Sequence, residues 1–333
     1  MPSSVSFINI LQSIHSVNGI NTMRISPAIT PIFEHVISKP RLDSYKGYFK
    51  TKSTDEAIGL YIWNNELSAC FGVLLSFFEI ALRNNTHRAM SQFYTRGTSS
   101  SDHWYDKIQG SLKQSTINKI DEVRYEGPRT ARKLRNPAPN PDEIVSRVSF
   151  GFWPVVLSTI NPRYADQIFP KIFPHHPLNA TPLDWKVKGV RQNALAFIYE
   201  LNEFRNRIAH HEPIWKFAAI KNTSIMPHIT VMPASRTLAD SMVRFQRLLD
   251  HLDGAMEAIN HGFHAELLQS SWRIKINYLL SGRGVARYRA CKHTPAKDSL
   301  TPTKFRRDFS SIVKRNQSVR VKRSYTNWLF TPE

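Results

Sequence analysis

Residues 67–81 read LSACFGVLLSFFEIA. Apolar side chains recur along this stretch at steps of three and four residues, which places them on one face of a helix. They are Leu67, Cys70, Leu74, Phe77, Phe78 and Ala81. The helical pattern begins near Thr54, runs towards Met90 and is broken by the polar run from Gly97 to Asp102. It therefore predicts one long helix.

Two more segments have the same period. The first spans about Asp184–His210, and Pro213 is expected to stop it; its stripe is Val187, Val190, Ala194, Ile198, Leu201, Phe204 and Ile208. The second carries Leu238, Met242, Phe245, Leu249, Leu252 and Met256. Shorter helices are predicted over Ile108–Val123 and Glu143–Val148, with a strand-like excursion at 223–232. Regular alternating strands are missing from the pattern, so we predict an all-α helical bundle.

The chain is strongly basic and its charge is uneven. It has 333 residues with 45 Lys+Arg and 26 Asp+Glu, a formal net charge of +19. Residues 281–333 contribute 13 basic and three acidic side chains, a net of +10. This balance favours a polyanionic partner. Aromatic residues among these charges would suit base stacking, and they are Tyr288, Phe305, Phe309, Tyr325 and Trp328. The alternative is a solvated basic tail without a dedicated ligand.

Several classes of protein are disfavoured. The sequence lacks an unbroken run of about 18 apolar residues, so we expect no membrane-spanning helix and no membrane partner. The first residues lack a basic leader followed by an apolar block, which argues against secretion. Cys70 and Cys291 are too few for a disulfide framework, so a cytoplasmic location is expected. Either Met1 or Met23 is a possible start of the chain.

The segment Arg205-Asn-Arg-Ile-Ala-His210-His211-Glu-Pro213 offers the sharpest chemistry. On a helix, Asn206 and His210 lie one turn apart and Arg205 lies beside them, whereas His211 follows the apolar stripe and should lean toward the core. An arginine binds phosphate oxygens, and a histidine moves protons near neutral pH. Such a string alone is weak, because most chance matches are structural.

A second polar group precedes it on the long helix. Glu79, Arg83 and His87 recur every four residues, with Asn84 beside them, and form a polar line on an apolar helix. One interpretation is a ladder of pairs within the helix. The other is that the line faces Arg205 and His210 across the bundle, because buried polar groups need partners or a ligand.

The remaining motifs give weaker functional signals. His175 and His176 lie in a proline-rich loop and should be exposed. His261 and His264 have metal-like spacing without an evident third ligand, so no metal site is predicted. Gly-rich phosphate loops, nucleophile elbows and Cys-x-x-Cys pairs are missing, and no cofactor is expected. Phe150, Phe152 and Trp153 should pack in the core.

Several strings together resemble the Abi-like (abortive infection) protein family of the HEPN superfamily. They occur in the family's order over about residues 39–260, and the last is the most specific: Lys39–Tyr45, Tyr61–Ser68, Phe78–Asn84 with His87, Ser149–Trp153 and Leu201–Trp215. The resemblance divides the chain into a weakly patterned segment (1–38), an Abi-like domain (39–260) and a basic C-terminal extension (261–333). Residues 216–232 and the tail from about Trp272 depart from the family pattern.

The resemblance implies an all-α HEPN-type bundle with additional helices and, in many relatives, metal-independent ribonuclease activity. The matching active-site residues are Arg205, Asn206 and His210, with His211 in support, and two copies of the motif meet in a homodimer. The expected role is RNA cleavage leading to growth arrest in phage defence, with a regulatory RNA or antitoxin-like protein as a further partner. Two alternatives stay open. One is a non-catalytic module that binds nucleic acid or a protein partner, and the other is a DNA-binding protein acting through its tail.

Overall fold

The computed structural model describes residues 30–128, 131–222, 229–292, 299–323 and 326–332. The chain divides into two compact units. The first unit comprises residues 1–70, 215–243 and 274–333, and the second comprises residues 71–214 and 244–273. Both candidate start residues, Met1 and Met23, lie outside the described residues.

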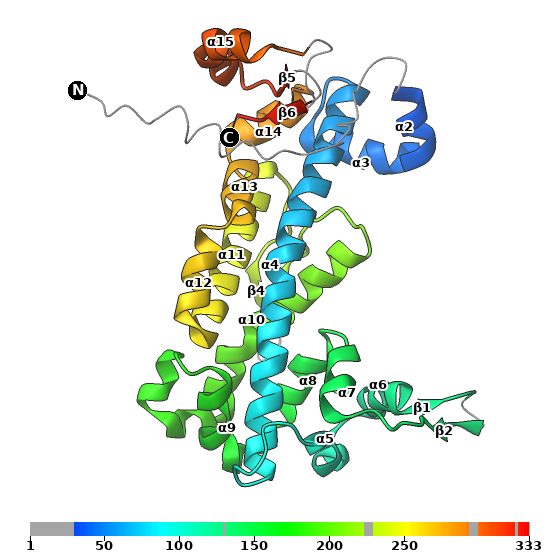
Figure 1. Ribbon diagram of the computed structural model, residues 1–333, viewed down its shortest axis with the longest axis vertical. Helices are drawn as coiled ribbons and strands as arrows, with labels where there is room; N and C mark the ends of the chain where they lie inside the picture. The colour runs from blue at the N-terminus through cyan, green and yellow to red at the C-terminus, as the bar shows by residue number, and fades with distance from the viewer. Residues whose placement is uncertain (1–29, 129–130, 223–228, 293–298, 324–325, 333) are drawn as a thin grey trace. The chain divides into compact units, whose positions relative to one another are not determined.

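Helices dominate both units, which confirms the all-α prediction (Figure 1). The α-helices are α2 (Thr30–Ile37), α3 (Lys39–Phe49), α4 (Thr54–Tyr94), α5 (Trp104–Lys107), α6 (Gln114–Arg124), α7 (Pro141–Arg147), α8 (Phe152–Thr159), α9 (Ala165–Ile172), α10 (Lys188–Ala209), α11 (Leu238–Ile259), α12 (His261–Leu268), α13 (Ser271–Leu279), α14 (Gly282–Arg289) and α15 (Pro302–Arg315). Short 3-10 helices are η1 (Gln109–Ser111), η3 (Pro162–Tyr164), η4 (Pro177–Ala180) and η5 (Pro182–Lys186).

The described strands form small antiparallel hairpins. They are β1 (Tyr125–Glu126) with β2 (Lys133–Leu134), β3 (Ile220–Asn222) with β4 (Ile229–Met232), and β5 (Val319–Arg323) with β6 (Thr326–Phe330). The strand-like prediction at 223–232 is confirmed for residues 229–232, and residues 223–228 lie outside the described residues.

The predicted long helix is α4, which runs without interruption for 41 residues (Figure 1). The backbone N–H of Glu56 donates to Ser53 Oγ at 3.2 Å near its start, and Asp55 and Glu56 place negative charge where a helix N-terminus favours it. Its end is marked by Arg96 and Gly97, both with positive φ. The sequence prediction of its beginning and of the break after it is thus confirmed.

By length and composition, α4 is also apolar enough to cross a membrane. Ser76 and Glu79 interrupt the apolar run of α4, but hydropathy averaged over an 18-residue window is high enough for a membrane span. In the most apolar window of this helix, 44% of the residues are buried within the protein. The core helix of a soluble protein passes the same test, so this property is weak support for a membrane span.

Two predicted helices have different ends in the structure. The prediction of one helix over Ile108–Val123 is wrong, because η1 covers Gln109–Ser111, Leu112 and Lys113 are extended, and α6 begins at Gln114. The helix predicted from Asp184 begins at Lys188, because Pro182 opens the separate turn η5.

Aromatic rings fill the core of the second unit. The ring of Phe71 meets that of Phe204 edge-on at 5.0 Å, and Phe78 meets Phe150 at 5.8 Å. Phe150, Phe152 and Trp153 are each at most 1% exposed, which confirms that they are core residues. These contacts pack α10 and the residues just before α8 against the second-unit part of α4.

The first unit has its own aromatic core. Trp215 lies within 5.1 Å of the rings of Tyr45 and Phe49, both on α3. Its backbone carbonyl accepts a hydrogen bond from Ser241 Oγ at 2.7 Å. The basic segment Lys39–Lys52 is therefore anchored by its aromatic side chains, with its charges outside.

The C-terminal extension is folded in the part of it that the structure describes. At Gly59 on α4, a Cβ atom would overlap the carbonyl oxygen of Tyr288 on α14, so glycine permits this close approach. Buried Arg287 donates to Pro332 O at 3.0 Å and also bonds Ser318. Phe305 packs in a small core with Ile312, Val319 and Val321.

This packing corrects the idea of a stacking surface in the tail. Tyr288 and Phe305 are buried, and Phe309 and Trp328 pack against the same small core as Phe305. Tyr325 lies outside the described residues. The aromatic residues alternate with charges because they face the inside of folded elements, so those four rings are unavailable as a platform for bases.

Candidate active site

Helix α10 carries the candidate motif on its last turns. Leu201 and Phe204 are buried on its inner face, Arg205 is half-buried, and Asn206 is exposed. Asn206 lies one turn before His210, and its backbone carbonyl accepts the N–H of His210 at 2.9 Å. Arg205 and Asn206 thus lie near the end of α10, and His210 is the residue that caps it.

The helix ends through its own backbone before Pro213. The N–H of His211 donates to Ile208 O at 3.0 Å, and the N–H of Glu212 donates to Arg207 O at 2.9 Å. His211 has a φ of 53°, in the left-handed region. This bond pair with a left-handed residue is a Schellman motif, a common helix end. The expectation that Pro213 stops the helix is wrong in its cause, because α10 has already ended at Ala209.

Both histidines are exposed. The prediction that His211 leans toward the core is wrong, because it assumed helical phase one residue past the helix end. The left-handed backbone turns the chain at His211, so the apolar stripe of α10 no longer applies to it. Two imidazoles thus project from the end of one helix.

Glu79 brings the two predicted polar groups together. Its Oε2 lies 3.7 Å from Arg205 Nε, and its Oε1 accepts a hydrogen bond from Arg83 at 3.2 Å. The side chain of Glu79 is 12% exposed, that of Arg83 17% and that of Arg205 37%. The two arginines therefore share one carboxylate, and the three groups carry a net charge of +1.

Arg83 retains unused hydrogen-bonding capacity. Its Nε is buried and makes no hydrogen bond within the described part of the chain. The surplus positive charge of two arginines on one carboxylate favours an oxyanion ligand such as a phosphate. Asn84, next to Arg83, is exposed.

His87 belongs to a different environment. It is buried, and its Nδ1 accepts a hydrogen bond from the indole of Trp104 at 2.8 Å. Its Nε2 lies 3.3 Å from Asp142 Oδ1 and 3.3 Å from Ser101 Oγ. Burial lowers the pKa of His87, and the charges of Asp142 and Asp102 offset only part of that effect. The predicted polar line thus splits after Arg83.

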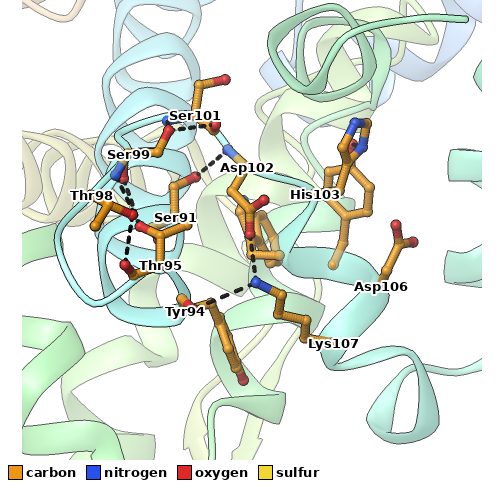
Figure 2. Close-up of polar contacts among 12 residues, drawn as sticks. Ser91, Tyr94, Thr95, Thr98, Ser99, Ser101, Asp102, His103, Asp106 and Lys107 are labelled. Atoms are coloured by element: carbon orange, nitrogen blue, oxygen red, sulfur yellow. Dashed lines mark hydrogen bonds and ion pairs between the residues drawn. The ribbon is translucent and has the colours of Figure 1, made fainter.

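A polar loop after α4 holds Ser101 in place (Figure 2). Thr95 Oγ1 accepts the N–H of Ser99 at 3.1 Å, and Ser91 Oγ accepts the N–H of Asp102 at 3.0 Å. Asp102 also pairs with Lys107 at 2.8 Å, which joins the loop to α5. The loop is therefore a fixed support for the His87 environment.

Sequence reasoning missed the role of Arg207. Its guanidinium pairs with Glu212 at 3.4 Å and bonds the carbonyl of Pro213, so it fixes the turn that carries His210 and His211. Burial lowers the pKa of Arg207, with the charge of Glu212 opposing the shift. The signal was present in the motif string, where a basic side chain precedes Glu212 by five residues.

A second missed cluster joins α10 to the second-unit part of α11. Glu200 lies 3.3 Å from Arg247 and 3.2 Å from His251, and Arg244 nearby is buried. Burial would raise the pKa of Glu200, but the bond with His251 and the charge of Arg247 outweigh it and lower the pKa. An arginine next to Phe245 in an apolar helix pattern was the available signal.

The other described histidines outside the α10 motif have separate surroundings. Within the described ranges, no group of three His, Cys, Asp or Glu side chains is placed to hold a metal ion. The ring of His261 lies 4.0 Å from that of the exposed His175 with the two planes tilted by 42°, and His264 lies 3.6 Å from Asp253. His176, expected to be exposed, is half-buried and caps η4.

Comparison with known proteins identifies one relationship. The family model described as Abi-like protein matches residues 31–216, which is 186 of the 333 residues and includes Glu79, Arg83, Arg205 and His210. No curated protein and no solved structure matches the chain. The chain therefore belongs to the Abi-like protein family, which suggests a role in abortive infection.

Proposed function

We propose that this protein is a metal-independent endoribonuclease of the HEPN superfamily, acting in abortive-infection defence. One observation carries the proposal: Glu79 ties Arg205 and Arg83 together beside the end of α10, where His210 is exposed. Two guanidinium groups supply charge for a phosphate, and an accessible imidazole supplies proton transfer.

The proposed reaction is attack of a ribose 2′-hydroxyl on the adjacent phosphorus. The 2′-O–P bond forms as the P–O5′ bond breaks, a base takes the 2′-hydroxyl proton, and an acid gives a proton to the leaving 5′-oxygen. The products end in a 2′,3′-cyclic phosphate and a 5′-hydroxyl. Arg205 and Arg83 would stabilise the negative charge that builds on the phosphoryl oxygens.

His210 is the proposed acid or base, and Asn206 would orient the phosphate from the turn before it. One histidine does not serve both oxygens in a single step. A symmetric homodimer would bring a second His210, and two-fold dimers are the commonest oligomers. General acid–base catalysis of this kind contributes about 10²–10⁴-fold in rate.

The test is cleavage of single-stranded RNA by purified protein in EDTA. We expect wild type and the control His35→Ala to cleave, since His35 is exposed and lies on α2. Arg205→Ala and His210→Ala should each lose at least about 100-fold in rate. Cleavage that needs added metal, or that survives both substitutions, contradicts the proposal.

A second measurement examines the cellular role. Expression of the wild-type protein should arrest growth, and Arg205→Ala and His210→Ala should relieve the arrest at equal protein levels. If both variants stay folded by circular dichroism and arrest growth fully, and the wild-type protein shows no cleavage, the protein is instead a non-catalytic binding module.

A further inference from the structure

The C-terminal module, defined as α15 with the β5–β6 hairpin, has its own core and a charged outside. Phe305 and Ile312 of α15 pack against Val319 and Val321 of β5. Val319 pairs with Phe330 across the hairpin, which brings that ring to the same core. The apolar face of α15 is therefore covered by the module itself.

The opposite face of α15 is basic. Lys304, Arg307, Lys314 and Arg315 are exposed, and their spacing of 3, 7 and 1 residues places them on one side of the helix. We call these four residues the basic stripe. From Lys304 to Arg315 the stripe is about 16 Å long at 1.5 Å per residue. Between them lie the exposed hydroxyl residues Ser310 and Ser311.

Little negative charge balances the stripe. Residues 299–332 contain eight Lys+Arg and one acid, Asp308. Asp308 pairs with Arg307 at 2.9 Å, and Arg315 Nε donates to the carbonyl of Ser311 at 3.3 Å. The side chains of Lys304 and Lys314 make no ion pair or hydrogen bond within the described ranges. The stripe is thus available to a polyanion.

We propose that the basic stripe binds the phosphate backbone of RNA. A membrane-binding helix needs apolar side chains to insert, and those of α15 are used in the module core. Since the aromatic rings are also inside, the contacts are with phosphates and carry no base sequence. The choice of RNA over DNA rests on the proposed ribonuclease function.

The charge count sets the expected salt dependence. Four phosphate contacts on a single strand give a slope of about −2.8 in log affinity against log salt, from about −0.7 per contact. Affinity should then fall about 50-fold between 50 and 200 mM salt. Because this module lies outside residues 31–216, the region that matches the family, it would be an addition to the family's domain.

The test measures binding of the full chain to a labelled 20-nucleotide 2′-O-methyl RNA by fluorescence anisotropy in EDTA. The methyl group blocks the proposed cleavage, so binding is read whether or not the protein is a ribonuclease. The stripe variant changes four side chains to Gln: Lys304, Arg307, Lys314 and Arg315. The matched control removes the same charge from exposed lysines in the second unit: Lys113, Lys133, Lys171 and Lys188.

We expect the stripe variant to bind at least 10-fold more weakly at 100 mM salt and to lose most of the slope, while the control changes affinity less than 3-fold. The double variant Lys304→Gln/Lys314→Gln, which breaks no ion pair or hydrogen bond of the described residues, should lower the slope by about 1.4. Equal losses in stripe variant and control overturn the proposal. So does tighter, stripe-dependent binding to duplex DNA or to anionic phosphatidylserine vesicles.

Stripe-dependent RNA binding without any cleavage by wild type would leave this inference standing and remove the ribonuclease proposal.

Discussion

At the end of α10, the stability difference between a Gly variant and an Ala variant should have opposite signs at the adjacent residues His210 and His211. His211 lies in the left-handed region with a φ of 53°, whereas His210 has a φ of −89°. We compare Ala with Gly at each position. Both replacements remove the same imidazole, so the side chain's contacts cancel within each pair and the difference reports the backbone.

The magnitudes follow from the two dihedral angles. At His211, alanine keeps a left-handed strain of about 1–2 kcal/mol, which glycine avoids. Glycine costs about 0.5–1 kcal/mol in backbone entropy at either position. His211→Gly should therefore be more stable than His211→Ala, by about 0.8 kcal/mol at the midpoints of these two ranges. At His210 no strain is relieved, so the Gly variant should be less stable than the Ala variant by about 0.5–1 kcal/mol.

Urea unfolding followed by circular dichroism at 222 nm measures both differences. Amide exchange at Glu212 adds a local reading, because its N–H is held by Arg207 O across the turn. The exchange rate should be slower in His211→Gly than in His211→Ala. If Gly is worse than Ala at both positions, the helix does not end in a Schellman motif and His211 is not left-handed.

The same four variants distinguish effects on the backbone from effects on catalysis. Under the proposed function, both His210 variants lose cleavage by about 10²–10⁴-fold. Both His211 variants should cleave RNA within about 3-fold of wild type if its main role is the turn. A loss in His211→Gly as large as in His210→Gly would make His211 a second acid or base.

Three further predictions concern contacts away from that turn. Glu79→Gln removes the carboxylate from Arg205, and we expect a loss of about 1–3 kcal/mol in unfolding free energy together with slower RNA cleavage; unchanged values for both would contradict the shared-carboxylate arrangement. Because burial lowers the pKa of His87 from its ordinary 6.5, the unfolded chain takes up the proton first, so stability should fall as pH drops below 6.5; a His87→Gln variant should show a shallower fall. Gly59→Ala should destabilise the protein by about 1–3 kcal/mol, since its methyl group meets the Tyr288 carbonyl; a neutral effect in urea unfolding would show that α14 does not pack there.

Sequence periodicity predicted the long helices well because burial selects apolar residues every three or four positions. The stripe around Leu67 and Phe78 sufficed for α4. Helix ends were less predictable, since they depend on backbone bonds that leave no apolar pattern. His211 shows this most clearly: a left-handed histidine is allowed, but the sequence shows nothing that distinguishes it from one more helical residue.

The prediction that aromatic residues of the C-terminal extension stack on bases was wrong for another reason. An aromatic residue next to a lysine gives the same local sequence pattern whether its ring stacks on a base or packs inside a small module. Phe305 and Trp328 pack inside, because α15 and β5 form a small core that the local sequence pattern does not predict. The basic side chains Lys304, Arg307, Lys314 and Arg315 of α15 are exposed, whereas Arg287 on α14 is buried.

The division of the polar line on α4 has a geometric cause. Each step of four residues turns 400°, so it advances 40° beyond a full turn around the helix axis. From Glu79 to His87 the direction therefore changes by about 80°. That rotation is enough to carry the line from the face that meets Arg205 to the one that meets Trp104. A four-residue repeat on so long a helix thus serves two neighbours, which is why Arg83 joins the candidate active site and His87 supports the fold.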